Sequence, residues 1–176
     1  MKMKNTKIAL SIALLTFGTA QASNFVAFTS ISEVTIEKNL CNNIDNHISL
    51  SALNTHIQNW NNNPSEENRK AISNACVDSI TDFSKLFMNS SWDGDLSSWN
   101  VSNGVDFNNM FTLNHFFNQD ISNWNVSKGV NFNEMFRYAS SFNQDISKWD
   151  TDKSVSWYAF DVGSGFDVWN IPLKFR

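Results

Sequence analysis

The second half of this 176-residue chain repeats itself every 25 residues. The stretch FNQDISNWNVS, which starts at Phe117, returns from Phe142 as FNQDISKWDTD. A unit of this length cannot bury its own apolar face, whereas stacked copies bury theirs against one another. The repeat therefore predicts a stack of similar units.

Each repeat contains two apolar patterns with different spacings. The first is apolar-x-x-apolar-x-apolar, which suits a short strand entered by a turn, because alternate strand side chains point the same way. It occurs at Leu96/Trp99/Val101, Ile121/Trp124/Val126, Ile146/Trp149/Thr151 and, compressed, at Phe166/Trp169/Ile171. The second has the spacing i, i+3, i+4, which favours one face of a short helix. It occurs at Phe107/Met110/Phe111 and at Phe132/Met135/Phe136.

We therefore predict an α/β repeat solenoid, a short right-handed stack of strand–turn–short helix units with turns at Gly104 and Gly129. Three to four repeats of 25 residues occupy residues 81–171, and the tail 172–176 closes the stack. Residues 23–80 are expected to form an N-terminal α-helical cap, since apolar residues recur there at helical spacing. Within it, residues 23–38 are expected to be extended.

The repeat resembles leucine-rich repeats, and more narrowly the BspA-like leucine-rich-repeat surface proteins. Their units read close to F-N-Q-D-I-S-x-W-D-V-S-x-V-x-x-M-x-x-M-F, and the resemblance covers residues 81–171 of this chain. It implies an exported or surface-displayed solenoid concerned with adhesion or host contact, without a catalytic centre. The chain departs from the pattern at Phe107, Phe132 and Trp157, which replace a Met, and in its small number of units.

The N-terminus has the features of a signal peptide. Lys2, Lys4 and Lys7 precede an apolar run that is too short to span a bilayer, and Ala20-Gln21-Ala22 is an A-x-A cleavage site. We predict cleavage after residue 22 and export to the periplasm, the cell surface or the medium. No later segment is apolar enough for membrane insertion.

The two cysteines, Cys41 and Cys76, are expected to form a disulfide that joins two cap helices, since exported proteins favour paired cysteines. Two buried free thiols are the alternative. Neither cysteine lies in a C-x-x-C motif or near paired histidines, so we predict neither a metal site nor a cofactor.

Charge and motifs narrow the possible functions. Three of the 13 basic residues lie in residues 1–22, which leaves 10 against 17 acidic residues, a net charge of −7. Nucleic acid and anionic membranes, which require a basic face, are therefore not expected as partners. No nucleophile motif or phosphate-binding loop is present, and we predict that the chain is not an enzyme. A pair of carboxylates acting as a glycosidase remains the open enzymatic alternative.

The central aromatic residue of the first pattern forms a column along the repeats. We predict that it belongs to the core, although an exposed strip for carbohydrate stacking is the alternative. The expected repeat core consists of Trp99, Trp124, Trp149, Trp169, Phe107, Met110, Phe132 and Met135.

Asp95, Asp120 and Asp145 form an acidic column. Carboxylates aligned ~4.8 Å apart repel one another, so we expect them to accept backbone N–H groups at the turn. A bridging Ca²⁺ is the alternative.

Polar side chains fill the outward positions of the predicted strands. As candidate ligand-binding residues we identify Ser98, Asn100, Asn123, Asn125, Lys148 and Asp150. They are either ordinary solvated strand residues or a face that recognises a protein or a glycan. The predicted function is therefore non-catalytic binding or adhesion. The alternative is a structural component that associates with itself through an exposed surface near residues 166–171.

Overall fold

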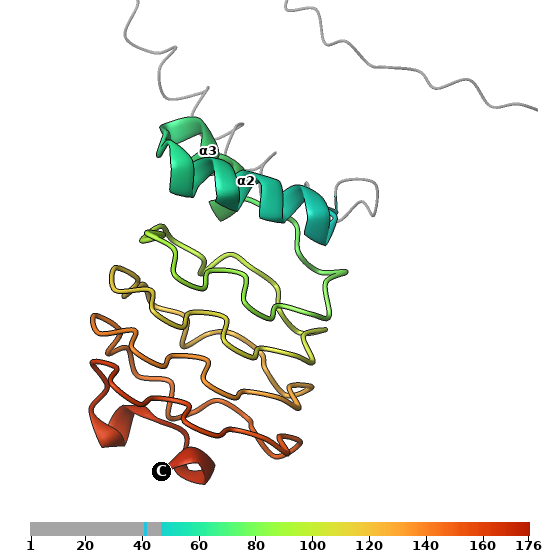
Figure 1. The fold of residues 1–176 in the computed structure, drawn as a ribbon. Coiled ribbons are helices and arrows are strands. Elements are labelled where there is room, and N and C mark those ends of the chain that lie inside the picture. Colours follow the sequence, from blue (N-terminus) through green and yellow to red (C-terminus); the bar gives the residue numbers. More distant parts are fainter. Residues whose placement is uncertain (1–40, 42–46) are drawn as a thin grey trace, which may run out of the picture. The chain divides into compact units, whose positions relative to one another are not determined.

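The computed structural model describes Cys41 and residues 47–176 (Figure 1). Two α-helices come first, α2 (Leu50–Asn62) and α3 (Glu66–Ser73). Two short 3-10 helices come last, η3 (Val168–Asn170) and η4 (Leu173–Phe175). Between them, coils of the repeating sequence stack on one another, with α2 and α3 at one end of the stack and the C-terminus at the other. The predicted signal peptide and the segment 23–38 lie outside the described residues.

Both helices lie in the predicted cap region and begin at serine N-caps. The hydroxyl of Ser49 accepts the backbone N–H of Ala52, and that of Ser65 accepts the N–H of Asn68. These bonds satisfy N–H groups that the first turn of a helix leaves unpaired. The apolar stripe of α2, formed by Leu53, Ile57 and Trp60, is buried, so α2 closes the N-terminal end of the core.

The predicted disulfide between Cys41 and Cys76 is confirmed, with its two Cα atoms 5.2 Å apart. Cys76 lies beyond the end of α3, in a bridge with His47, so the disulfide does not join two helices as predicted. On the chain-entropy model, a closed loop of this length stabilises the fold by about 3–4 kcal/mol.

The predicted α/β solenoid of strand–turn–short helix units is wrong. From residue 74 to residue 167 the structure contains neither a helix nor a strand, and neighbouring coils share only isolated β-bridges. These bridges join Asp82 to Asp106, Asp106 to Asn131 and Asn131 to Ser156. The bridges follow the predicted repeat interval, so the sequence period was correct whereas the secondary structure within it was not.

The expected short helices are replaced by turns whose N–H groups alternate in direction. The N–H groups of Met110 and Thr112 donate to carbonyls three residues earlier, at 3.2 Å. Every second N–H instead donates to the following coil. These bonds, 2.8 or 2.9 Å long, run from Phe107, Asn109, Phe111 and Leu113 to the carbonyls of Asn131, Asn133, Met135 and Arg137. The other coils repeat this pattern, which we call the backbone ladder.

Left-handed residues make this alternation possible and exclude a helix. Each coil has two residues with positive φ, four positions apart. They are Lys85 and Asn89, Asn109 and Leu113, Glu134 and Tyr138, and Ala159 and Gly163. A left-handed conformation costs most residues roughly 1–2 kcal/mol, and only Gly and Asn adopt it easily. The bonds to the next coil offset this cost by about 1 kcal/mol each.

The expected strands fail because side chains capture their N–H groups. Asp95 accepts the N–H of Ser97 at 2.8 Å, and Asn100 accepts that of Ser102 at 3.2 Å. The following coils repeat both turns. Such Asx turns compete with a strand ladder for the same N–H groups. The side of the coil that was predicted as strand is therefore built from turns.

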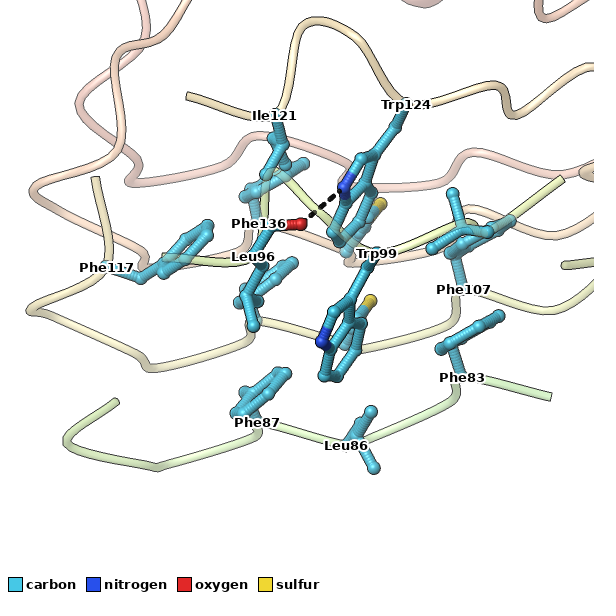
Figure 2. Close-up of a cluster of buried hydrophobic side chains, with 14 of the residues drawn as sticks. Phe83, Leu86, Phe87, Leu96, Trp99, Phe107, Phe117, Ile121, Trp124 and Phe136 are labelled. Atoms are coloured by element: carbon cyan, nitrogen blue, oxygen red, sulfur yellow. Dashed lines mark hydrogen bonds between the residues drawn. The ribbon is translucent and has the colours of Figure 1, made fainter. Parts of the chain in front are cut away.

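Aromatic columns form most of the core (Figure 2). Trp99, Trp124 and Trp149 are at most 5% exposed, and their rings stack 6.3–6.4 Å apart. The indole N–H of Trp124 donates to the carbonyl of Leu96 at 3.0 Å, as Figure 2 shows, and that of Trp149 donates to Ile121. The prediction of a tryptophan core is confirmed for these three residues, because packing and the indole N–H are both satisfied. Phe107, Met110, Phe132 and Met135 are fully buried, as predicted.

Trp169 does not belong to the core, contrary to the prediction. Its side chain is 71% exposed and lies in η3, over the guanidinium of Arg176. The fourth repeat is not compressed as supposed: Ile171 is buried, 25 residues after Ile146, and the carbonyl of the preceding Asn170 accepts the N–H of Ile146. The shared apolar spacing around Trp169 matched the wrong register.

The contrast between the two tryptophans gives a matched test. Trp124→Ala should lower the free energy of unfolding by about 3–5 kcal/mol, because it removes a buried ring and a hydrogen bond. Trp169→Ala should change it by less than about 1 kcal/mol, because that ring is mostly solvated. Denaturant melts of both variants measure the difference, and equal losses would contradict this description of the core.

Candidate functional site

The six residues predicted to bind a ligand are all exposed, on the turn-built side of the coils. Several of their side chains connect neighbouring coils. The hydroxyl of Ser98 donates to the carbonyl of Ser73, the amide of Asn123 donates to that of Ser97, and the amide of Asn100 donates to Asp78. Asn125 and Asp150 accept the N–H groups of their own Asx turns. The structure therefore gives five of the six residues an internal role, and ligand binding by them stays a prediction.

The strand face on which that prediction was based is absent, since these residues lie in turns. Lys148 is the only one of the six without a hydrogen bond among the described residues. It lines a polar recess of about 230 Å³ together with Asp120, Ser122, Gln144 and Asp145. The recess contains both signs of charge but no buried polar group that would orient a ligand.

The acidic column accepts backbone N–H groups, as predicted. Asp95, Asp120 and Asp145 each accept the N–H of the serine two residues later, at 2.8–3.0 Å. Hydrogen bonds from Ser122 lower the pKa of Asp120, and hydrogen bonds from Ser147 lower the pKa of Asp145. Among the described residues, no three His, Cys, Asp or Glu side chains are grouped to hold a metal ion.

A second surface lies at the C-terminal end of the stack, which we call the C-terminal end. Six large apolar side chains are 47–78% exposed there. They are Val155, Tyr158, Val162, Val168, Trp169 and Leu173. A hollow of about 460 Å³ lies along the last coil, lined by residues 155–162 and Phe175. Exposed apolar surface of this kind commonly marks an interaction site.

The backbone ladder ends at this surface with unpaired donors. The third coil donates to the carbonyls of Ser156, Tyr158, Phe160 and Val162. The last coil has no successor, so the N–H groups of Trp157, Ala159, Asp161 and Gly163 find no acceptor among the described residues. We call these four groups the open donor row. The carbonyl of Val155, at its start, is also unpaired there.

The tail covers only the inner part of the last coil. Phe175 is buried and contacts Trp157, Phe160 and Phe132, with ring centroids 4.9–5.5 Å apart. Lys174 Nζ donates to the carbonyls of Thr151, Asp152 and Ser154. The tail thus protects the aromatic core but leaves the open donor row and its neighbouring side chains uncovered.

The N-terminal end of the stack is closed differently. The carbonyls of Asp82, Ser84, Leu86 and Met88 accept no N–H among the described residues. Helix α2 runs along this row: its first residues line a hollow with residues 80–82, and Asn61 near its end accepts the hydroxyl of Ser90. A helix covers the acceptor row, whereas no such element covers the donor row.

The sequence analysis anticipated an exposed surface near residues 166–171 only as the mark of self-association, and it did not identify residues 155–162. A signal was present in the repeat itself. Tyr158 replaces Asn108 and Asn133 of earlier coils, and Val162 replaces Thr112 and Arg137. The last repeat therefore carries apolar residues at outward positions that are polar elsewhere.

Comparison with known proteins identifies a family without a known activity. The family model described as "Mycoplasma protein of unknown function, DUF285" matches residues 57–164. This range includes the second half of α2, α3 and nearly all of the coils. Neither a curated protein nor a solved structure matches the chain. In the described part of the chain, no helix is both long and apolar enough to cross a membrane.

The lowered pKa values of Asp120 and Asp145 predict a specific acid response. Their contribution to stability is present above the ordinary pKa of 3.8 and is lost as the pH falls through the lower folded values. Asp120→Asn with Asp145→Asn keeps an oxygen for each Asx turn but removes the titration. The double variant should match the parent at pH 7 and lose less stability between roughly pH 5 and pH 2. Identical melting curves across this range would show that the two carboxylates do not contribute.

Proposed function

We propose that this chain, which belongs to the DUF285 family of proteins of unknown function, is an exported, non-catalytic interaction protein that binds a protein partner through its C-terminal end. The observation that carries the proposal is the coincidence of exposed apolar side chains with unpaired backbone donors on the last coil. Apolar contacts supply affinity, and backbone hydrogen bonds add direction.

Export is supported by the charged and apolar N-terminal pattern and by the disulfide between Cys41 and Cys76, since disulfides persist in oxidising compartments. The periplasm, the cell surface and the medium all satisfy this requirement. The resemblance of the repeat to the BspA-like surface proteins supports a role in adhesion or recognition. That resemblance concerns the sequence motif, because the strands and helices expected from it are absent.

Self-association is the second candidate function. An exposed apolar surface at the C-terminal end is the feature that the sequence analysis expected of a self-associating scaffold, and the structure contains it. Two copies could pack these side chains together without using the open donor row. Light scattering over a range of protein concentrations distinguishes this candidate from a separate partner.

Residues 23–176, produced in an oxidising compartment, should be screened against an array of extracellular-matrix proteins and glycans. Two double variants distinguish the surfaces: Tyr158→Lys with Val162→Lys at the C-terminal end, and Asn125→Lys with Asp150→Lys on the turn-built side. All four side chains are exposed, so the melting temperature should not change.

We expect binding to a protein on the array, lost at least tenfold in the first double variant and retained in the second. Loss in the second variant alone would move the site to the polar residues predicted from the sequence. Binding to glycans only, or a concentration-dependent oligomer without any array binding, would contradict the proposal.

A further inference from the structure

The open donor row places a strict chemical requirement on whatever covers it. From residue 157 to residue 163 the edge offers N–H groups only, because the carbonyls of Trp157, Ala159 and Asp161 already accept N–H groups within their own coil. A matching partner must therefore present hydrogen-bond acceptors without donors between them. The single unpaired carbonyl of Val155 adds one acceptor at the start of the row.

The molecule shows three times what satisfies such a row. In each of the first three coils, alternate N–H groups donate to carbonyls at every second residue of the following coil. For Phe107, Asn109, Phe111 and Leu113 the acceptors are residues 131, 133, 135 and 137, and the N–H of Val130 returns a bond to the carbonyl of Val105. The acceptor is thus a turn-built segment in the conformation of these coils.

Two common partners do not meet this requirement. A second copy related by a two-fold axis would place one donor row against another. A regular β-strand brings an N–H together with each carbonyl on the same edge, so its own N–H groups would oppose the row. A copy arranged head to tail offers the correct carbonyls on its first coil, but α2 runs along them.

We infer that the C-terminal end captures a polypeptide segment of a partner chain that adopts the conformation of one of these coils, with backbone carbonyls at every second residue directed at Trp157, Ala159, Asp161 and Gly163. This inference rests on the proposed function and adds the chemistry of its ligand. The spacing of the row favours a polypeptide over a glycan, because the identical rows inside the molecule pair with polypeptide at a two-residue period.

Side chains beside the row supply the apolar part of the contact. Val155 and Tyr158 are 73% and 76% exposed and line the same hollow as the donors. Phe175 already covers the inner face of the last coil, so the captured segment lies along its outer edge. Its apolar side chains would therefore contact Val155, Tyr158 and Val162 rather than the core.

The probe is a peptide with the sequence of residues 130–140, VNFNEMFRYAS, which pairs with an identical row inside the molecule. It should be titrated to roughly millimolar concentration, the range of weak peptide contacts, into ¹⁵N-labelled protein of residues 23–176. A peptide of the same composition in scrambled order is the control. We expect saturable shifts of the amide signals of the four open donors and at least tenfold slower hydrogen exchange at these positions.

Val162→Lys and Met88→Lys form a matched pair of variants, since both residues occupy the same position of the repeat and Arg137 shows that a long basic side chain fits there. The first variant should weaken peptide binding at least fivefold, and the second should leave it unchanged. Both should fold as the parent does, because each native side chain is more than 40% exposed.

Shifts confined to side chains, with unchanged exchange of the four amides, would overturn the backbone inference and leave the proposed function standing. Absence of any shift, or equal shifts with the scrambled peptide, would overturn it as well. Failure of the array experiment, in contrast, would concern the proposed function itself.

Discussion

The backbone ladder between coils is the interaction on which the rest of this structure depends. Each coil lacks helices and strands, so its alternate N–H groups have no regular partner within the coil. Pairing them with the carbonyls of the next coil satisfies them and sets the 25-residue interval. The aromatic columns follow, because rings at the same repeat position are then held in stacking contact.

A ladder with one direction has two unlike ends. Carbonyls remain at the first coil, where α2 runs along them, and N–H groups remain at the last coil, where only the core is covered by the tail. Stacked repeats need caps at both ends, and here the two caps differ in completeness. The incomplete cap coincides with the exposed apolar residues of the last repeat, which is why we place the interaction surface there.

The repeat period, the paired cysteines, the two cap helices and most of the core could be predicted from the sequence. The conformation within a repeat could not, because an apolar spacing of i, i+3, i+4 is compatible both with a helix and with turns that point the same residues inward. The choice was made by left-handed residues such as Leu113 and Glu134, which have no left-handed preference of their own. Only the ladder to the neighbouring coil stabilises them there, and the sequence of one repeat does not reveal it.

The site was harder to predict for a related reason. The polar residues Ser98 and Asn123 are conspicuous in the sequence, yet in the structure they hold one coil to the preceding one. The end of a ladder, in contrast, has no sequence motif, because any residue has a backbone N–H. Its only trace is the change from polar to apolar residues at Tyr158 and Val162 in the last repeat.

Native-state hydrogen exchange of the isolated monomer tests the central claim most directly. Our account predicts strong protection of the amides of Phe132, Glu134, Phe136 and Tyr138, which donate to the last coil. It predicts exchange near the unfolded-chain rate at the equivalent positions one coil later, Trp157, Ala159, Asp161 and Gly163. Equal protection of both sets in the monomer would mean that the donor row is already covered, and it would contradict an open C-terminal end.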